Sequence, residues 1–123
     1  MKSNRSEYLP VIQKLLERTQ QGRVHWQGGL GTFYCSLGWE RESTLKFTLS
    51  SIATQDINHD TRFLVMEDIH GNELFRVESN DLPTSAEEEA ISNLVNQLYD
   101  LARREALKVD EKLELASSLL DQV

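Results

Sequence analysis

The spacing of apolar residues divides the chain into three blocks, and the first of these has helical periodicity. Pro10 is tolerated only in the first turn of a helix, and Gly22 suits the position just after the last turn. The pattern therefore predicts a helix over residues 9–21 with one apolar face. The residues on that face are Tyr8, Ile12, Leu15, Leu16 and Thr19.

The middle block alternates between apolar and polar residues, which is typical of antiparallel strands with one covered face. Residues 62–69 and 73–78 form the clearest hairpin, because Gly71 provides the positive φ that a short loop needs. Residues 28–31 either turn an earlier hairpin between strands 24–27 and 32–37 or form a bulge within one long strand. The apolar positions of two further strands are Phe33, Cys35, Leu37, Leu45, Phe47 and Leu49.

The third block returns to helical spacing. It opens with a capping box, formed either by Thr84 and Glu87 or by Ser85 and Glu88. The chain near Asp110 either ends this helix and caps another or lies inside one long helix. Asp110 is a good cap and a poor interior residue, which favours two helices. Their apolar residues are Ile91, Leu94, Val95, Leu98, Leu101 and Ala102 in the first, and Leu113, Ala116, Leu119 and Leu120 in the second.

The order of these blocks predicts a single α+β domain over residues 1–123. It has an N-terminal helix, an antiparallel β-meander of four to five strands, and two C-terminal helices packed on one face of the sheet. A length of 123 residues fits one such domain, and 39% hydrophobic residues argue against disorder. No apolar run approaches the roughly 20 residues that span a bilayer, so we expect no membrane segment.

Charge and cysteine content bear on partners and location. The formal net charge is −7, which disfavours nucleic acid as a partner, although residues 1–24 are net positive. In that segment Lys14 and Arg18 lie one turn apart and make a modest basic strip, typical of a solvated face. The lone Cys35 forms no internal disulfide and residues 1–6 are polar, so we expect a cytoplasmic protein without a signal peptide.

Metal and nucleophile patterns are weak. Residues 56–67 place oxygen ligands at four positions of a calcium loop, but Thr61 stands where that loop requires glycine. His25, His59 and His70 lack the spacing of a zinc motif. Cys35 lies on the apolar face of a strand, where cysteine acts as a small hydrophobic residue. We expect no metal, no cofactor and no catalytic residue, and the sequence leans away from an enzyme.

Aromatic residues provide a candidate binding site. Trp26 and Trp39 flank the glycine-rich stretch, and Tyr34 lies between them on the polar side of its strand. Beside Arg23 and Arg41, exposed aromatic rings would stack on bases or clamp a ligand. Alternatively, both tryptophans cover the edge of the sheet core.

The chain carries four loose motifs, namely Leu15-Leu16 with Thr19, Gly22 and Trp26; Asp68 with Gly71; Leu98-Tyr99 with Ala102-Arg103; and Val109-Asp110. Together they resemble a widespread family of small bacterial α+β domains that are generally described as uncharacterised. The resemblance implies a bacterial cytoplasmic origin and an α+β fold, and it implies no activity. Tyr99 and Arg103 join the candidate site residues, because a helix face does not require them.

These observations favour a non-catalytic protein-interaction or regulatory module, for which we consider a homodimer. An open meander leaves an edge strand able to pair with another chain. One alternative is a small-ligand site that uses the aromatic cluster between sheet and helices, and another is a weak single-stranded nucleic-acid binder. The last helix also has apolar residues on more than one side, namely Leu113, Leu115, Ala116, Leu119 and Leu120.

Overall fold

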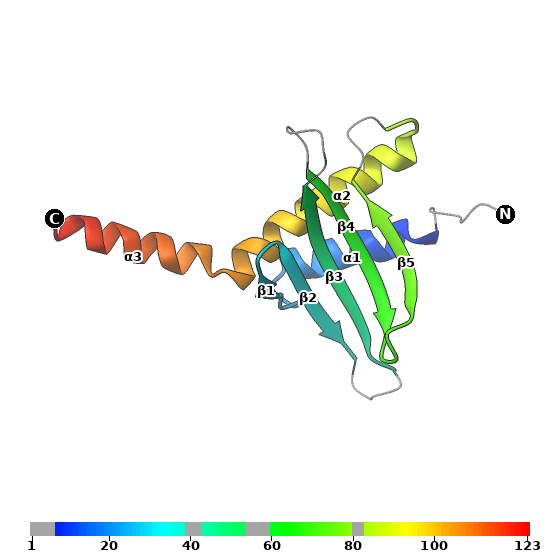
Figure 1. Cartoon of the computed structure of the whole chain (residues 1–123), viewed down its shortest axis with the longest axis horizontal. Helices are drawn as coiled ribbons and strands as arrows, with labels where there is room; N and C mark the ends of the chain where they lie inside the picture. The colour runs from blue at the N-terminus through cyan, green and yellow to red at the C-terminus, as the bar shows by residue number, and fades with distance from the viewer. Residues whose placement is uncertain (1–6, 39–42, 54–59, 80–82) are drawn as a thin grey trace.

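The computed structural model describes residues 7–38, 43–53, 60–79 and 83–123 and has the predicted α+β architecture (Figure 1). The five strands form one antiparallel sheet in the order β1-β2-β3-β4-β5, which is a simple meander. The elements are α1 (Leu9–Gln20), β1 (Gln27–Gly29), β2 (Thr32–Leu37), β3 (Leu45–Ala53), β4 (Asp60–Asp68), β5 (Glu73–Glu78), α2 (Ala86–Ala106) and α3 (Val109–Asp121).

Helices α1 and α2 cover one face of the sheet, as predicted, and lie behind it in Figure 1. α1 has Pro10 in its first turn and ends before Gly22, whose φ is +74°. The predicted face of α1 is buried at four of its five positions, with Tyr8 half-buried. The fully buried side chains between sheet and helices include Phe33, Ile12, Leu49, Leu64, Ile91, Leu98, Val77 and Val95.

The first hairpin lies further along the chain than predicted. Gln27 pairs with Tyr34 and Gly29 with Thr32, so the turn consists of Leu30 and Gly31, both with positive φ. The alternative of a hairpin is therefore correct, but the prediction of a strand over residues 24–27 was wrong. The chain leaving α1 first packs Val24 and Trp26 into the core, where the tryptophan donates a hydrogen bond to Thr19 on α1.

The second hairpin is confirmed. β4 and β5 are joined by a short turn in which Gly71 has a φ of +82°. The Asp68 carboxylate accepts hydrogen bonds from the backbone N–H groups of His70 and Asn72 and from the Asn72 side chain, each at 2.9 Å. These bonds satisfy the turn's donors and pull the pKa of Asp68 below its usual value, the Asn72 side chain contributing most.

The last two helices are separate, as predicted. Ser85 caps α2 by accepting a hydrogen bond from the backbone N–H of Glu88 at 3.1 Å, so the second capping alternative is correct. The prediction that Asp110 caps α3 was wrong. The break falls at Lys108, whose left-handed backbone (φ +52°) redirects the chain, and Asp110 lies in the first turn of α3.

Candidate interaction surface

Helix α3 departs from the predicted packing on the sheet. It has no buried residue, and it extends away from the body formed by the sheet, α1 and α2 (Figure 1). Its attachment is short, because only Leu107 and Lys108 separate it from α2. The Arg104 guanidinium on α2 pairs with the Asp110 carboxylate on α3 across this junction.

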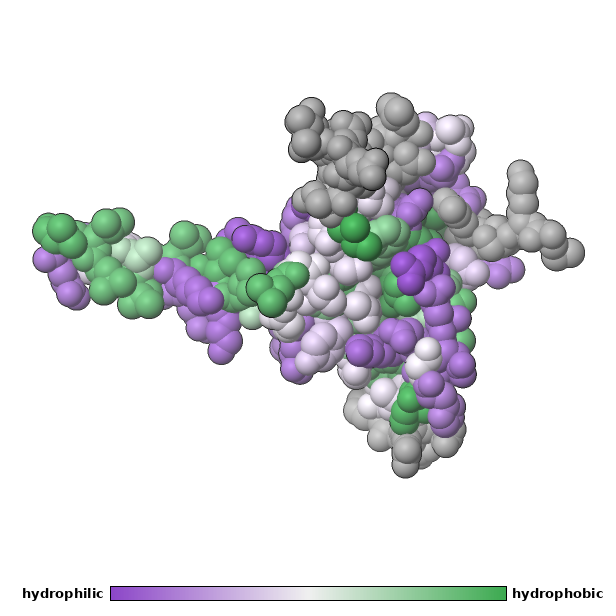
Figure 2. All heavy atoms as spheres, viewed as in Figure 1, coloured by the Kyte–Doolittle hydropathy of each residue, from purple (hydrophilic) through white to green (hydrophobic). Residues whose placement is uncertain are grey.

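Large apolar side chains on α3 are exposed to solvent. Leu113, Leu115, Leu119 and Leu120 have 59%, 57%, 52% and 71% of their surface accessible. Figure 2 shows these hydrophobic residues gathered along the projecting helix. Because monomeric proteins rarely expose a contiguous apolar patch on one element, this surface is a candidate for contact with another protein.

The apolar residues of α3 form one stripe, within which Lys112 is the charged residue. At 100° per residue the stripe spans about 160° of the helix circumference, wider than the seam of a two-stranded coiled coil. Most of the acidic residues lie on the opposite side, so the stripe itself contains no carboxylate. We define the α3 stripe as Val109, Leu113, Leu115, Ala116, Leu119, Leu120 and Val123.

The length of α3 strengthens this interpretation. Isolated helices shorter than about 12–15 residues are marginal in water, and most helical stability in proteins comes from packing of an apolar face. α3 has 13 residues and packs none of them into the core. Its stability as a helix therefore depends on whatever covers the stripe.

The sheet edges are less suited to pairing than the sequence suggested. β1 has only three residues, two of them glycines. β5 carries Glu73, Arg76 and Glu78, and Arg76 pairs with Glu73 at 2.8 Å. Short and charged edge strands are the usual protection against edge-to-edge association, so α3 is the stronger candidate surface.

A second apolar surface lies on the body. Among the described residues, α1 and the neighbouring strands β2 and β3 enclose an open groove of about 320 Å³. Most of the residues that line it are apolar, and two basic residues of α1, Lys14 and Arg18, also line it. The lining residues are Pro10, Val11, Lys14, Leu15, Arg18, Val24, Leu37 and Phe47. We call this the α1 groove.

Sequence reasoning missed the α1 groove because its walls come from segments far apart in the chain. The only signal was the basic strip of Lys14 and Arg18, which by itself indicates an ordinary solvated face. Val11 and Leu37, which line the groove, keep 41% and 37% of their surface exposed. The sequence pattern placed Leu37 among the apolar positions of a strand and left Val11 off the apolar face of the first helix, so it gave no reason to connect the two.

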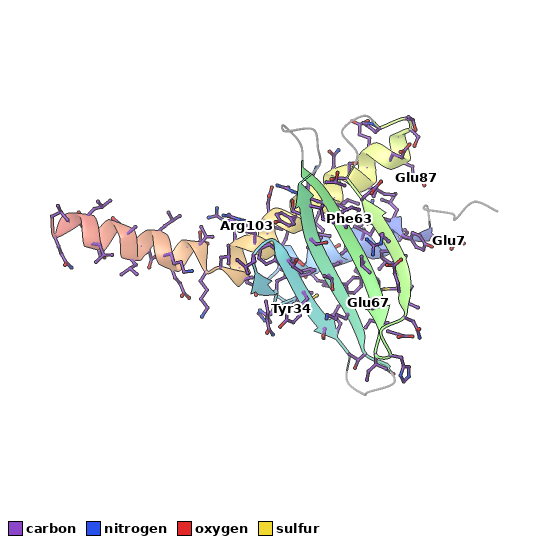
Figure 3. All side chains as sticks on the ribbon, in the orientation of Figure 1. Glu7, Tyr34, Phe63, Glu67, Glu87 and Arg103 are labelled. Carbon is purple, nitrogen blue, oxygen red and sulfur yellow. The ribbon has the colours of Figure 1, made fainter. Side chains whose placement is uncertain are left out.

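Trp26 and Tyr34, two members of the predicted aromatic cluster, do not come together between sheet and helices. Trp26 is 3% exposed in the core, and its Nε1 donates to Thr19 Oγ1 at 3.2 Å. Tyr34 lies on the opposite, exposed face of the sheet (Figure 3), because its neighbours Phe33 and Cys35 point into the core. Trp39 lies outside the described residues.

On that exposed face, two aromatic rings already have cationic partners. Lys46 Nζ lies 5.1 Å from the centre of the Tyr34 ring, and the Arg76 guanidinium lies 5.5 Å from that of Phe63. Glu67 belongs to the same face (Figure 3). The mixture of both charges gives this face no preference for an anionic ligand.

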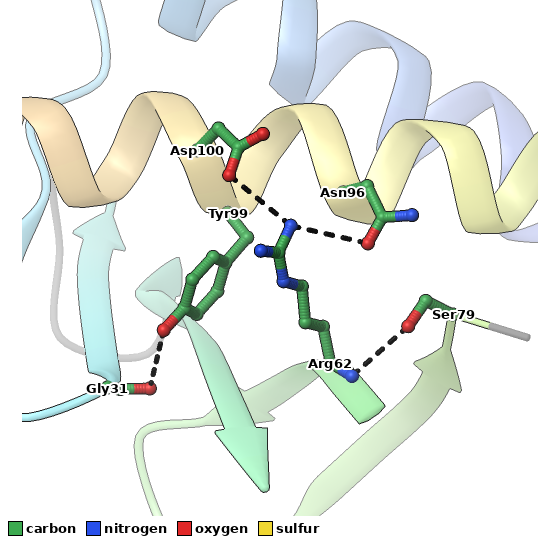
Figure 4. A network of polar contacts seen from close by, with 6 residues as sticks. All are labelled: Gly31, Arg62, Ser79, Asn96, Tyr99 and Asp100. Carbon is green, nitrogen blue, oxygen red and sulfur yellow. Dashed lines mark hydrogen bonds and ion pairs between the residues drawn. The ribbon is translucent and has the colours of Figure 1, made fainter. Parts of the chain in front are cut away.

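Tyr99 has a structural environment. Its ring packs edge-on against Phe33, and its hydroxyl lies 3.5 Å from the carbonyl oxygen of Gly31 (Figure 4). The Arg62 guanidinium stacks over the ring at 4.4 Å and donates to the Asp100 carboxylate at 3.3 Å. This network ties the start of β4 to α2. Arg103, the other candidate residue from α2, is exposed.

The described residues that the sequence offered as metal ligands or nucleophiles do not gather into one site. Within the described residues, no group of three or more His, Cys, Asp or Glu side chains is placed to hold a metal ion. His25 Nδ1 lies 2.9 Å from Glu105 Oε1 on the surface. His59 and the first residues of the predicted calcium loop, 56–59, lie outside the described residues, and residues 60–67 belong to β4. Burial raises the pKa of the Cys35 thiol to about 12, which keeps it protonated and a poor nucleophile at neutral pH.

The chain was compared with known protein families, curated proteins and solved structures. No family model, curated protein or solved structure matches this chain. A search of the described helices for a segment long and apolar enough to cross a membrane found none.

Proposed function

We propose that this protein is a non-catalytic interaction module that self-associates through the α3 stripe. The observation that carries the proposal is the exposure of four leucines on a helix that buries none of its residues. Full burial of an exposed leucine contributes on the order of 1.5–3 kcal/mol, and the part still exposed on these four side chains is what association could gain against its entropic cost. The wide stripe is also suited to packing against a broad surface.

A ligand site built from Trp26 and Tyr34 has less support. The two side chains lie on opposite faces of the sheet, and the hydrogen-bonding group of Trp26 is already used by Thr19. The exposed face around Tyr34 also carries no net preference for nucleic acid, since Lys46 and Arg76 alternate there with Glu67 and Glu78. We therefore favour the interaction module over both alternatives.

Sedimentation velocity over a concentration series tests the proposal. The wild-type mass should rise above the 14.1 kDa of one chain as concentration increases from about 1 µM to about 200 µM, a range that covers weak to moderate dissociation constants. The double variant Leu113→Gln/Leu120→Gln keeps the charge and the helix propensity of α3 but removes two of the four exposed leucines of the stripe. It should stay at the mass of one chain throughout.

Ser118→Gln provides the matched control, because residue 118 lies on α3 opposite the stripe. This variant should associate like the wild type. A wild type that stays monomeric over the whole range, or a control that is impaired as much as the leucine variant, would contradict the proposal. Circular dichroism of the body helices and unfolding midpoints confirm that each variant is folded.

A further inference from the structure

If the protein self-associates through the α3 stripe, as proposed above, some surface of a second copy must receive it. We propose that this receiving surface is the α1 groove, so that α3 of one copy docks between α1 and the β2–β3 strands of another. The inference rests on the proposed function and adds to it the identity of the partner surface. Three observations on the described residues support it.

The first observation is complementary shape and polarity. The α3 stripe is a projecting apolar ridge, and the α1 groove is an open, mainly apolar hollow of about 320 Å³. A hollow of this size takes leucine side chains from one face of a helix. Val11 and Leu37 provide exposed apolar contacts at its walls, and both would lose this exposure when α3 docks.

The second observation is complementary charge. α3 has a net charge of −3, with Asp110, Glu111, Glu114 and Asp121 against the single Lys112. The groove instead presents two cations from α1, Lys14 and Arg18. Pairing two α3 helices would bring like net charges together, whereas docking in the groove brings a net negative helix to two cations. Because most α3 carboxylates lie opposite the stripe, this attraction acts over about one Debye length of 8–10 Å and not as ion pairs inside the hollow.

Both groove cations are available to attract an approaching α3. Lys14 is exposed and has no hydrogen bond or ion pair within the described parts of the chain. Arg18 has only neighbours on its own helical segment, with Nη1 at 2.9 Å from Gln21 Oε1 and 3.9 Å from Glu17 Oε1. An exposed ion pair at 3.9 Å is weak, so it is no obstacle to a new partner.

The third observation is that α3 does not reach the groove of its own chain. No residue of α3 lines that groove, and α3 extends away from the body (Figure 1). The Arg104–Asp110 ion pair and the short connection at Lys108 maintain this direction. The ridge and the hollow therefore remain unpartnered within one chain and can meet between two.

A complementation experiment tests the inference. The groove variant Val11→Glu/Lys14→Glu places two carboxylates in the groove and leaves α3 intact, while Leu113→Gln/Leu120→Gln does the opposite. Each alone should be monomeric, with self-association weakened on the order of 100-fold, as expected for the loss of two large apolar contacts. Mixed in equal amounts, the two variants should form a one-to-one complex, because one intact α3 then meets one intact groove. Because the two variants have nearly the same mass, one of them is labelled uniformly with nitrogen-15, and native mass spectrometry then distinguishes the mixed complex from either homodimer.

Gln13→Glu is the matched control for the groove, because residue 13 is exposed on α1 and does not line the hollow. It should leave association unchanged. A second variant, Lys14→Glu/Arg18→Glu, keeps the apolar lining and should weaken association on the order of tenfold through charge alone. Its unfolding midpoint shows whether α1 is intact, so a folding defect cannot be mistaken for a lost contact.

Failure of this inference differs from failure of the proposed function. If the groove variants self-associate like the wild type while the leucine variant does not, α3 binds another surface and only the inference is overturned. If both variants are monomeric but no complex forms on mixing, the inference is again overturned. A wild type that is monomeric at every concentration overturns the proposed function as well.

Discussion

Helices α1 and α3 are nearly equal in length but differ in how much of each helix packs against the core. α1 has 12 residues and buries four of them, Ile12, Leu15, Leu16 and Thr19. α3 has 13 residues and buries none, although it too carries apolar residues at helical spacing. The difference shows that amphipathic periodicity determines which face of a helix needs covering, and says nothing about what covers it.

The two helices are also anchored differently. Thr19 on α1 accepts a hydrogen bond from Trp26 and donates to the carbonyl of Leu15, so the end of the helix is fixed to the core. α3 is attached by two residues and the exposed Arg104–Asp110 ion pair. Exposed pairs of this kind contribute about 0–1 kcal/mol, which is too little to order a helix by itself.

The largest expected difference between α1 and α3 is in how much a leucine-to-alanine substitution lowers the free energy of unfolding. Leu16→Ala in α1 should reduce the free energy of unfolding by about 2–5 kcal/mol, because it leaves a cavity in the core. Leu120→Ala in α3 should change it by less than about 0.5 kcal/mol in dilute, monomeric protein. Urea denaturation followed by fluorescence measures both. A large loss with Leu120→Ala would show that α3 packs on the body of its own chain.

Much of the fold could be predicted because the deciding signals are local. Pro10 and Gly22 delimit α1, the serine at position 85 and Glu88 begin α2, and Gly71 turns the second hairpin. Each acts through its own backbone or a neighbour within four residues, so one segment of sequence contains the whole cause. The single sheet with α1 and α2 on one face then follows from the alternating pattern.

The errors fall where side-chain pattern is missing or where distant segments meet. Residues 28–31 have little alternation, so the register of β1 depended on Trp26 packing into the core, a long-range effect. The sequence did not reveal that Trp26 and Tyr34 lie on opposite faces. The α1 groove was likewise not predictable, since it exists only when α1 meets β2 and β3.

A smaller effect is expected at the ends of the two long helices of the body. Gly22 follows α1 with a φ of +74° and open space around it, so Gly22→Ala introduces backbone strain without a clash. We expect a loss of about 1 kcal/mol in unfolding free energy. Lys108 follows α2 with a φ of +52°, and Lys108→Gly relieves comparable strain. Because only α3 lies beyond it, we expect a gain of less than about 0.5 kcal/mol for the monomer.

Thermal and urea unfolding of both variants at low protein concentration measure this pair. If the two variants change the unfolding free energy by equal and opposite amounts, the α2–α3 junction unfolds together with the core. That result would contradict the view that α3 is held less firmly than α1. Hydrogen exchange of α3 amides provides the independent readout. These amides should exchange rapidly in dilute protein and become protected as association increases.

The smallest expected effect concerns pH and the turn at Asp68. Its folded-state pKa is lowered by hydrogen bonds from Asn72 and His70, so its contribution to stability is present above the unfolded pKa and is lost as pH falls through the folded value. Asp68→Asn should therefore lower the urea midpoint slightly at about pH 7, and the difference from wild type should shrink towards about pH 3. Asp121→Asn on α3 is the control, and should leave the midpoint unchanged at both values, because α3 contributes little to unfolding of the monomer. A pH-independent difference for Asp68→Asn would show that the turn depends on side-chain shape, and an effect of Asp121→Asn would mean that α3 belongs to the cooperative core.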